Sequence, residues 1–546
     1  MHRDRELAIP DDPRPAHVSE IPRFLHDPVE ALRAHLAPSR AALVQDLDLE
    51  TVVQAMAAGD TFLFRAGWHA VLASLNDPEA IRYRQEVLAD CIAQPAVIRE
   101  IYALSVAAIE GERREWLTRD SVHAETSLHR SLTLLRLFVV QLRELRHIAD
   151  EHRAAFRSAG LTRFLGMVAS ELDDPCLGAM EDHLDRLRLK GGLWLRARMG
   201  PLHTDTTHTL CRPRVAAAQT WRERLGLGGR SALTYEVSAL DRHGLEALGE
   251  LRDRGIAPTA DALEEAVDDL LAFFGQLRGE LGFYVGCLNL HEELARRGVP
   301  TCFPDPEPTG PILSAQGLCE PALSIRSPEP VVGNDLAADG ALLLVITGAN
   351  GGGKSTFLRS VGLAQLMMQC GMFVAAKSFR ADLRTDVFTH FKREEAATLR
   401  SGKLDEELDR MSAVVDRLTP DGIVLLNESF ASTNEREGSE IARQIVRALL
   451  HLGVKVCYVT HMHDLAAGFA REALPEARFL RAERLSDGRR TFRMIQGEPE
   501  PTSHGEDVYR RVFGAGQVQQ VRQVSAPVAD AGHGGARLSQ SRGSDG

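Results

Sequence analysis

A glycine-rich segment that ends in a lysine and a serine is the part of the sequence best suited to chemistry. It has the pattern Gly348-x-x-x-x-Gly353-Lys354-Ser355. The apolar residues 342–345 before it predict a buried strand, and the amphipathic residues after it predict a helix. Backbone N–H groups in such a loop turn inward around an anion, and the helix N-terminus adds the positive end of its dipole. The sequence therefore predicts a phosphate-binding loop.

Individual residues of this loop have separate expected roles. Lys354 is placed for the β- and γ-phosphates of a nucleotide, and the Ser355 hydroxyl for Mg²⁺. We therefore expect ATP and Mg²⁺ as cofactors. The residues expected to contact the nucleotide are Gly348, Ala349, Asn350, Gly351, Gly352, Gly353, Lys354, Ser355 and Thr356.

Two further predicted strands end in polar residues. The apolar run 422–426 leads to Asn427 and Glu428, where phosphate-loop ATPases carry a metal-holding carboxylate and then a glutamate that polarises water. Glu428 is therefore the general-base candidate, whereas Asn427 reaches Mg²⁺ through water without a charge. The run 454–459 is followed by His461, which is placed to sense the γ-phosphate. We expect Lys354, Glu428 and His461 to be catalytic, with hydrolysis slowed by Asn427.

Length and composition describe a protein of several domains. The chain has 546 residues, 44% of them hydrophobic and 26% charged. Its eight cysteines form no CxxC pair, which favours reduced thiols over a zinc site. We find neither an 18-residue apolar run nor a signal-peptide core, so we expect no membrane contact and a cytoplasmic location. With a net charge of −12, any nucleic-acid contact would be local.

Helical periodicity dominates the first half of the chain. Residues 125–160 and about 259–298 each predict one long helix. The second half is expected to be an α/β domain, a largely parallel sheet with flanking helices. The expected divisions are an arm at 1–27, a helical core and lever domain at 28–300, a connector at 301–340, the α/β domain at 341–515 and a disordered tail at 524–546.

A basic insertion at about 186–245 separates the two long helices. Residues 186–230 hold ten basic and two acidic side chains, a local charge of 10 − 2 = +8. Alternating patterns at 192–198 and 231–240 predict a small β element there. Such a segment can contact DNA phosphates or be a solvated insertion, and both interpretations stay open. The candidates for DNA contact are Arg196, Arg198, Arg212 and Arg214.

Three motifs together resemble the MutS family of DNA-repair ATPases, which belong to the ABC-type ATPases. They are TGANGGGKSTFLR, VLLNESFASTNERE and VTHMHDL, and both Asn350 and the Thr433-Asn434 step are MutS-like details. The segment 401–411 loosely resembles the family signature that reaches a partner's nucleotide in the dimer. The resemblance is strong over about 310–515 and architectural over about 28–300.

The resemblance implies a homodimeric ATPase that binds DNA and switches state with ATP in repair or recombination. The long helices would form its lever and the basic insertion its clamp. We find no N-terminal mismatch-reading domain with its Phe-x-Glu wedge in the sequence, so we expect structured DNA as the target rather than mismatched bases. The alternative is a nucleotide-gated dimeric scaffold, impaired in hydrolysis by Asn427, that acts through protein partners.

Overall fold

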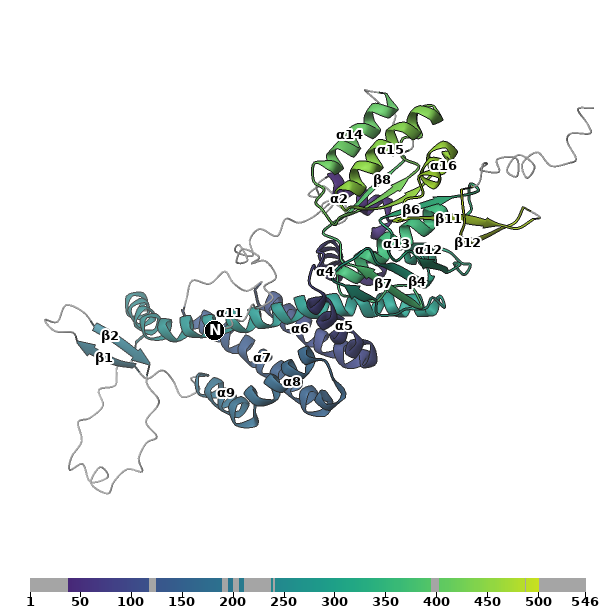
Figure 1. Cartoon of the computed structure of the whole chain (residues 1–546). Helices are drawn as coiled ribbons and strands as arrows, with labels where there is room; N and C mark the ends of the chain where they lie inside the picture. Colours follow the sequence, from purple (N-terminus) through teal and green to yellow (C-terminus); the bar gives the residue numbers. More distant parts are fainter. Residues whose placement is uncertain are drawn as a thin grey trace, which may run out of the picture.

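The chain folds into a helical half and a half built on two β-sheets (Figure 1). The computed structural model describes residues 38–116, 124–188, 195–199, 206–210, 237–238, 241–393, 402–486 and 488–499. The expected arm at 1–27 and tail at 524–546 lie outside these ranges, as do Arg212 and Arg214. Arg196 and Arg198 lie on a described strand, but their side chains are outside the description.

The helical half is arranged around one very long helix, α11 (Arg242–Arg296), of 55 residues. Along this helix pack α6 and α7, and near its C-terminal end α3 and α4. Near its other end it contacts an antiparallel hairpin of β1 (Leu195–Met199) and β2 (Thr206–Leu210). The remaining elements are α2 (Pro38–Asp46), α3 (Leu49–Ala57), α4 (Thr61–Leu72), α5 (Pro78–Ala93), α6 (Pro95–Trp116), α7 (Ala124–His152), η2 (Arg153–Ala155), α8 (Ala159–Glu171) and α9 (Asp174–Arg186).

The single helix predicted over 125–160 is wrong at its C-terminal end, because α7 stops at His152. Asp90 of α5 accepts hydrogen bonds from the backbone N–H groups of Arg157 (2.8 Å) and Ser158 (2.7 Å). These donors are thereby taken out of any continuing helix. The Ser158 side chain then caps a new helix, α8.

The helix predicted over 259–298 is longer than expected. It begins at Arg242, where the Asp241 carboxylate accepts a hydrogen bond from Gly244 N (3.0 Å), and it continues through Pro258. Proline usually marks a helix boundary because it lacks an N–H group and crowds the preceding turn. Here the helix is continuous across Pro258, and the residues on either side of it, Ile256 and Ala260, are both buried.

The main sheet has the strand order β12-β11-β6-β10-β9-β8. Its strands are parallel except β12, which runs antiparallel to β11. Every residue of β6, β8 and β10 is buried, as expected for strands covered on both faces. The strands predicted before the glycine loop, before Asn427 and before His461 are confirmed as β6, β9 and β10. The elements are β6 (Leu343–Thr347), α13 (Lys354–Gln369), β8 (Val387–Phe391), α14 (Lys403–Val415), β9 (Ile423–Asn427), α15 (Glu435–His451), β10 (Lys455–Val459), α16 (His463–Glu472), β11 (Ala477–Arg484) and β12 (Arg490–Gln496).

Residues 301–340, expected as a connector, are instead folded into a second sheet. This sheet has the order β3-β7-β4-β5, and β7 comes from beyond the glycine loop. The segment is therefore structurally part of the C-terminal half. Its elements are β3 (Asp305–Glu307), β4 (Leu313–Leu318), α12 (Pro321–Arg326) and β5 (Asn334–Ala337), and they pair with β7 (Ser378–Asp382).

A buried group of charged side chains joins the two sheets. Lys455 of β10 donates through Nζ to Asp382 Oδ1 on β7 (2.5 Å) and to the carbonyl oxygen of Ile312 (2.8 Å). Arg384 pairs with the other oxygen of Asp382. Burial, assisted by the Arg384 charge, lowers the pKa of Lys455 to about 8.

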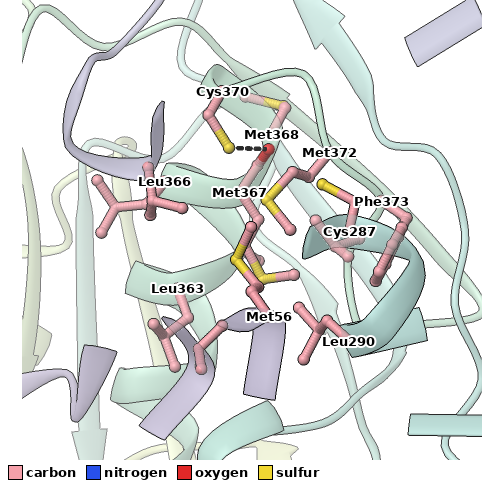
Figure 2. Close-up of a cluster of buried hydrophobic side chains, with 14 of the residues drawn as sticks. Met56, Cys287, Leu290, Leu363, Leu366, Met367, Met368, Cys370, Met372 and Phe373 are labelled. Carbon is pink, nitrogen blue, oxygen red and sulfur yellow. Dashed lines mark hydrogen bonds between the residues drawn. The ribbon is translucent and has the colours of Figure 1, made fainter. Parts of the chain in front are cut away.

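A sulfur-rich core connects the long helix to the α/β half (Figure 2). It brings together residues of α3, α11, α13 and the segment after α13, all of them buried. Burial raises the pKa of the Cys370 thiol to about 12, so this thiol stays protonated. Unbranched methionines fill irregular gaps in such a core. The labelled side chains are Met56, Cys287, Leu290, Leu363, Leu366, Met367, Met368, Cys370, Met372 and Phe373.

Within the described ranges, no single helix is long and apolar enough to cross a membrane. The pair Pro78–Ala93 and Pro95–Arg114 passes that test only when taken together, and it is bent by 101°. Apolar side chains of both helices, among them Leu88 and Ile101, lie in the protein core.

Candidate functional site

The glycine loop lies between β6 and α13 and depends on residues without a Cβ atom. Gly348, Gly351 and Gly353 have φ angles of +108°, +69° and +92°, a region that favours glycine. A Cβ on Gly348 would also lie 2.8 Å from the backbone nitrogen of Ala482 on β11. The loop therefore curls tightly and packs against the neighbouring strand, and α13 begins directly after it at Lys354.

Lys354 lies inside the curl of the loop and is 5% exposed. Its Nζ donates hydrogen bonds to the carbonyl oxygens of Gly348 (2.8 Å) and Ala349 (3.1 Å). Burial lowers the pKa of Lys354, against the opposing attraction of Glu428. An anion in the loop would offset that burial cost, because it would provide the ammonium group with a charged acceptor.

Ser355 connects the loop to the end of β9. Its hydroxyl donates to Asn427 Oδ1 over 2.9 Å. The two groups predicted to serve Mg²⁺ are thus adjacent, although 72 residues separate them in the chain. Both are uncharged oxygen donors, and oxygen donors fit a Mg²⁺ ion that keeps several waters and takes its remaining contacts from phosphates.

Glu428 follows Asn427 in a left-handed conformation, with φ +53°. Its N–H donates to the carbonyl oxygen of Val459 at the end of β10 (2.8 Å). The side chain lies beside His461, with 3.7 Å between Oε1 and the ring Nδ1. The interaction with the neighbouring His461 ring, together with the charges of Lys354 and Lys392, holds the pKa of Glu428 below its usual range although burial opposes this. Glu428 is therefore ionised at neutral pH.

The strand ends thus bring Lys354, Glu428 and His461 to one edge of the sheet, because β6, β9 and β10 are neighbouring parallel strands. The loop residues Gly348 to Thr356 occupy the same edge. The sequence predicted these strand ends, whereas the roles of the residues remain predictions.

The segment that resembles a family signature lies next to this edge as helix α14. Glu407 of α14 is buried, and its Oε1 accepts from the Ser432 hydroxyl (3.0 Å). The backbone carbonyl of Glu407 contacts His390 Nε2 (3.0 Å), and His390 Nδ1 lies 2.8 Å from Ser429 Oγ. The pKa of His390 falls to about 4 because the ring is buried, so the ring stays neutral. Helix α14 is therefore firmly connected to the loop after Glu428.

The β11–β12 hairpin forms a wall of the site that the sequence did not indicate. Ala482 packs against Gly348 and Gly352, and Phe492 and Met494 lie next to Gly353. The alternation of residues 490–496 could have suggested a strand. Local patterns give no sign that a hairpin some 130 residues downstream pairs beside the loop.

The structure is thus a helical half arranged around α11, joined to an α/β half whose glycine loop lies between β6 and α13. The chain belongs to the MutS family. Residues 76–297 match the family model described as MutS2 N-terminal domain, and residues 344–521 match the one described as MutS domain V.

Similar proteins carry the same family names. The chain is 32% identical over 208 residues to the DNA mismatch repair protein MutS of Chloroflexus aurantiacus, covering 37% of this chain and 21% of that protein. It is 30% identical over 295 residues to the endonuclease MutS2 of an Anaeromyxobacter species, covering 50% of this chain and 35% of that protein. The endonuclease MutS2 of Thermus thermophilus is 33% identical over 159 residues, with 29% and 21% covered. The matched region thus spans about a fifth to a third of these relatives.

Proposed function

We propose that this protein is an ATP-dependent DNA-binding protein of the MutS type, a dimer that ATP binding and hydrolysis switch between states on DNA. The observation that carries the proposal is the convergence of Lys354, Ser355, Asn427, Glu428 and His461 at one edge of a parallel sheet. Membership of the MutS family supports repair or recombination as the setting.

In this proposal each residue acts on a bound nucleotide. Lys354 exchanges the loop carbonyls for β- and γ-phosphate oxygens. Ser355 and Asn427 hold Mg²⁺, which neutralises phosphate charge when it is bound. Glu428 is ionised and orients the attacking water, while His461 beside it responds to the γ-phosphate.

The target we propose is structured DNA rather than a mismatched base pair. Support comes from the basic insertion that separates the two long helices in the sequence, and from the hairpin β1–β2, which lies near the end of α11 remote from the sheets. Arg196, Arg198, Arg212 and Arg214 stay the candidate DNA contacts.

The test is steady-state ATP hydrolysis with and without duplex, single-stranded and branched DNA, together with ATP binding. We expect turnover that changes with one DNA form, and Lys354→Ala as the control should lose ATP binding. Failure of the purified protein to bind either ATP or any DNA at low salt would refute the proposal.

One observation favours a second function, a nucleotide-gated scaffold. Asn427 contributes no negative charge to the metal position, and its Oδ1 already accepts the Ser355 hydroxyl. Such a protein would bind ATP and dimerise yet hydrolyse little with any DNA, and its targets would be proteins. A normal turnover rate would remove this alternative.

A further inference from the structure

Arg490, the first residue of β12, lies directly over the glycine loop. A Cβ atom on Gly351 would be 2.5 Å from Arg490 Nη1 and 3.5 Å from Cζ. The guanidinium therefore occupies the space that the missing side chain of Gly351 leaves open. The register of the hairpin fixes this position, because Arg490 of β12 pairs with Arg484 of β11. Two residues earlier on β11, Ala482 packs on the same glycine loop.

Among the described residues, the Arg490 guanidinium has neither a hydrogen bond nor an ion pair. By contrast, Arg380 of β7 and Arg384 just after it pair with carboxylates. The charge of Arg490 also lies close enough to Lys354 to disfavour the charged ammonium. The two positive charges repel each other, and an anion bound between them would reduce this repulsion.

The charge balance around the loop points in the same direction. The charge of Arg490 acts on Lys354, and the charges of Lys354 and Lys392 act on the carboxylate of Glu428, so these four residues together carry a net positive charge. The neutral Asn427 adds no compensating charge. A ligand with several negative charges suits this site better than one with a single charge.

We propose that Arg490 is a phosphate-binding residue of this site, which contributes in cis a second cation to the polyphosphate of the nucleotide. The inference rests on the proposed function and deepens it. Arginine suits the role because its planar group donates several hydrogen bonds to phosphate oxygens and stays charged at every physiological pH.

The test compares three ligands that differ in their phosphates: ATP, ADP and adenosine. Arg490→Gln removes the charge but keeps a polar side chain, and Arg490→Lys keeps the charge. Arg489→Gln is the matched control, since it removes the same charge from an exposed neighbour. Calorimetric titration gives the affinities, and circular dichroism checks that each variant is folded.

For Arg490→Gln we expect affinity for ATP and ADP to fall about tenfold or more, as for loss of a hydrogen bond between charged groups. Affinity for adenosine should not change, and Arg490→Lys should restore part of the loss. A role that is only structural would weaken all three ligands alike.

Three outcomes would overturn the inference. ATP affinity of Arg490→Gln equal to that of the wild type would show that the guanidinium does not contact phosphate. Tighter ATP binding would mean that Arg490 obstructs the loop. If the wild type itself bound no nucleotide, the proposed function would fail as well, which separates that result from the other two.

Discussion

Glu320 gives the structure a pH dependence that can be calculated. The residue caps α12 between α3 and α13 and is only 2% exposed. One carboxyl oxygen accepts the N–H of Leu323, and the other has no hydrogen-bond partner in the described part of the chain. Burial raises the pKa of Glu320 to about 7, although Arg359 nearby favours the charged form.

The sign and size of the effect follow from this pKa. Below pH 4.5 the folded and unfolded states are both protonated, and no stability is lost. Between pH 4.5 and 7 only the unfolded state releases the proton, so the free energy of unfolding falls as the pH rises. Above pH 7 the free energy of unfolding is lower by roughly 3 kcal/mol than it is below pH 4.5. Glu320→Gln carries no charge and should avoid this loss.

The assay is urea unfolding of the wild type and Glu320→Gln, followed by circular dichroism at pH 5 and pH 8. We expect the stability advantage of the variant to grow by about 2 kcal/mol between these two pH values. Glu329→Gln is the control, because Glu329 is exposed and should show no such growth. An advantage that is equal at both pH values would show that Glu320 is already ionised in the folded protein.

Three further predictions concern the edge of the main sheet. Glu428→Gln should keep ATP binding but slow hydrolysis by about 100-fold or more, since it removes the ionised group beside His461; unchanged turnover would exclude Glu428 as the group that orients water. Asn427→Asp should raise Mg²⁺-dependent turnover by adding the missing charge, and an unaltered rate would mean that another group already holds the metal. Gly438→Ala should destabilise the protein by about 1–3 kcal/mol in urea unfolding, because its Cβ would overlap the backbone carbonyl oxygen of Phe430. Gly275→Ala in α11 meets no atom within 4 Å and is the control, and equal effects of the two would contradict the packing argument.

The strands that carry the site could be predicted because their signal is local. The runs that end at Thr347, Asn427 and Val459 are continuously apolar, and each is followed by the polar residues that form the candidate site. Once the strands pair in parallel, their C-terminal ends meet at one edge of the sheet, so no other prediction is needed to bring these residues together. The contact between Ser355 and Asn427 is a direct result of this arrangement.

The elements that sequence analysis missed depend on partners that are distant in the chain. Helix α7 ends because Asp90, some 60 residues earlier, accepts the N–H groups after it. The expected connector becomes a sheet because β7, beyond the glycine loop, pairs with both β3 and β4. Arg490 reaches Gly351 only through the pairing of β12 with β11. Patterns within a short stretch of sequence cannot reveal these contacts, because the contacting residues lie far apart in the chain.

The length of α11 has a mechanical consequence. At about 1.5 Å per residue, its 55 residues span roughly 80 Å. One end shares the sulfur-rich core with α13, the helix that begins at the glycine loop, and the other end reaches the β1–β2 hairpin. From Leu290 in the core to Gly255, which Leu195 of the hairpin approaches, α11 spans about 50 Å, so a tilt of about 5° at the core would move the hairpin by about 5 Å. Side-chain adjustments too small to change the sheet would thus become displacements comparable to the width of a DNA groove.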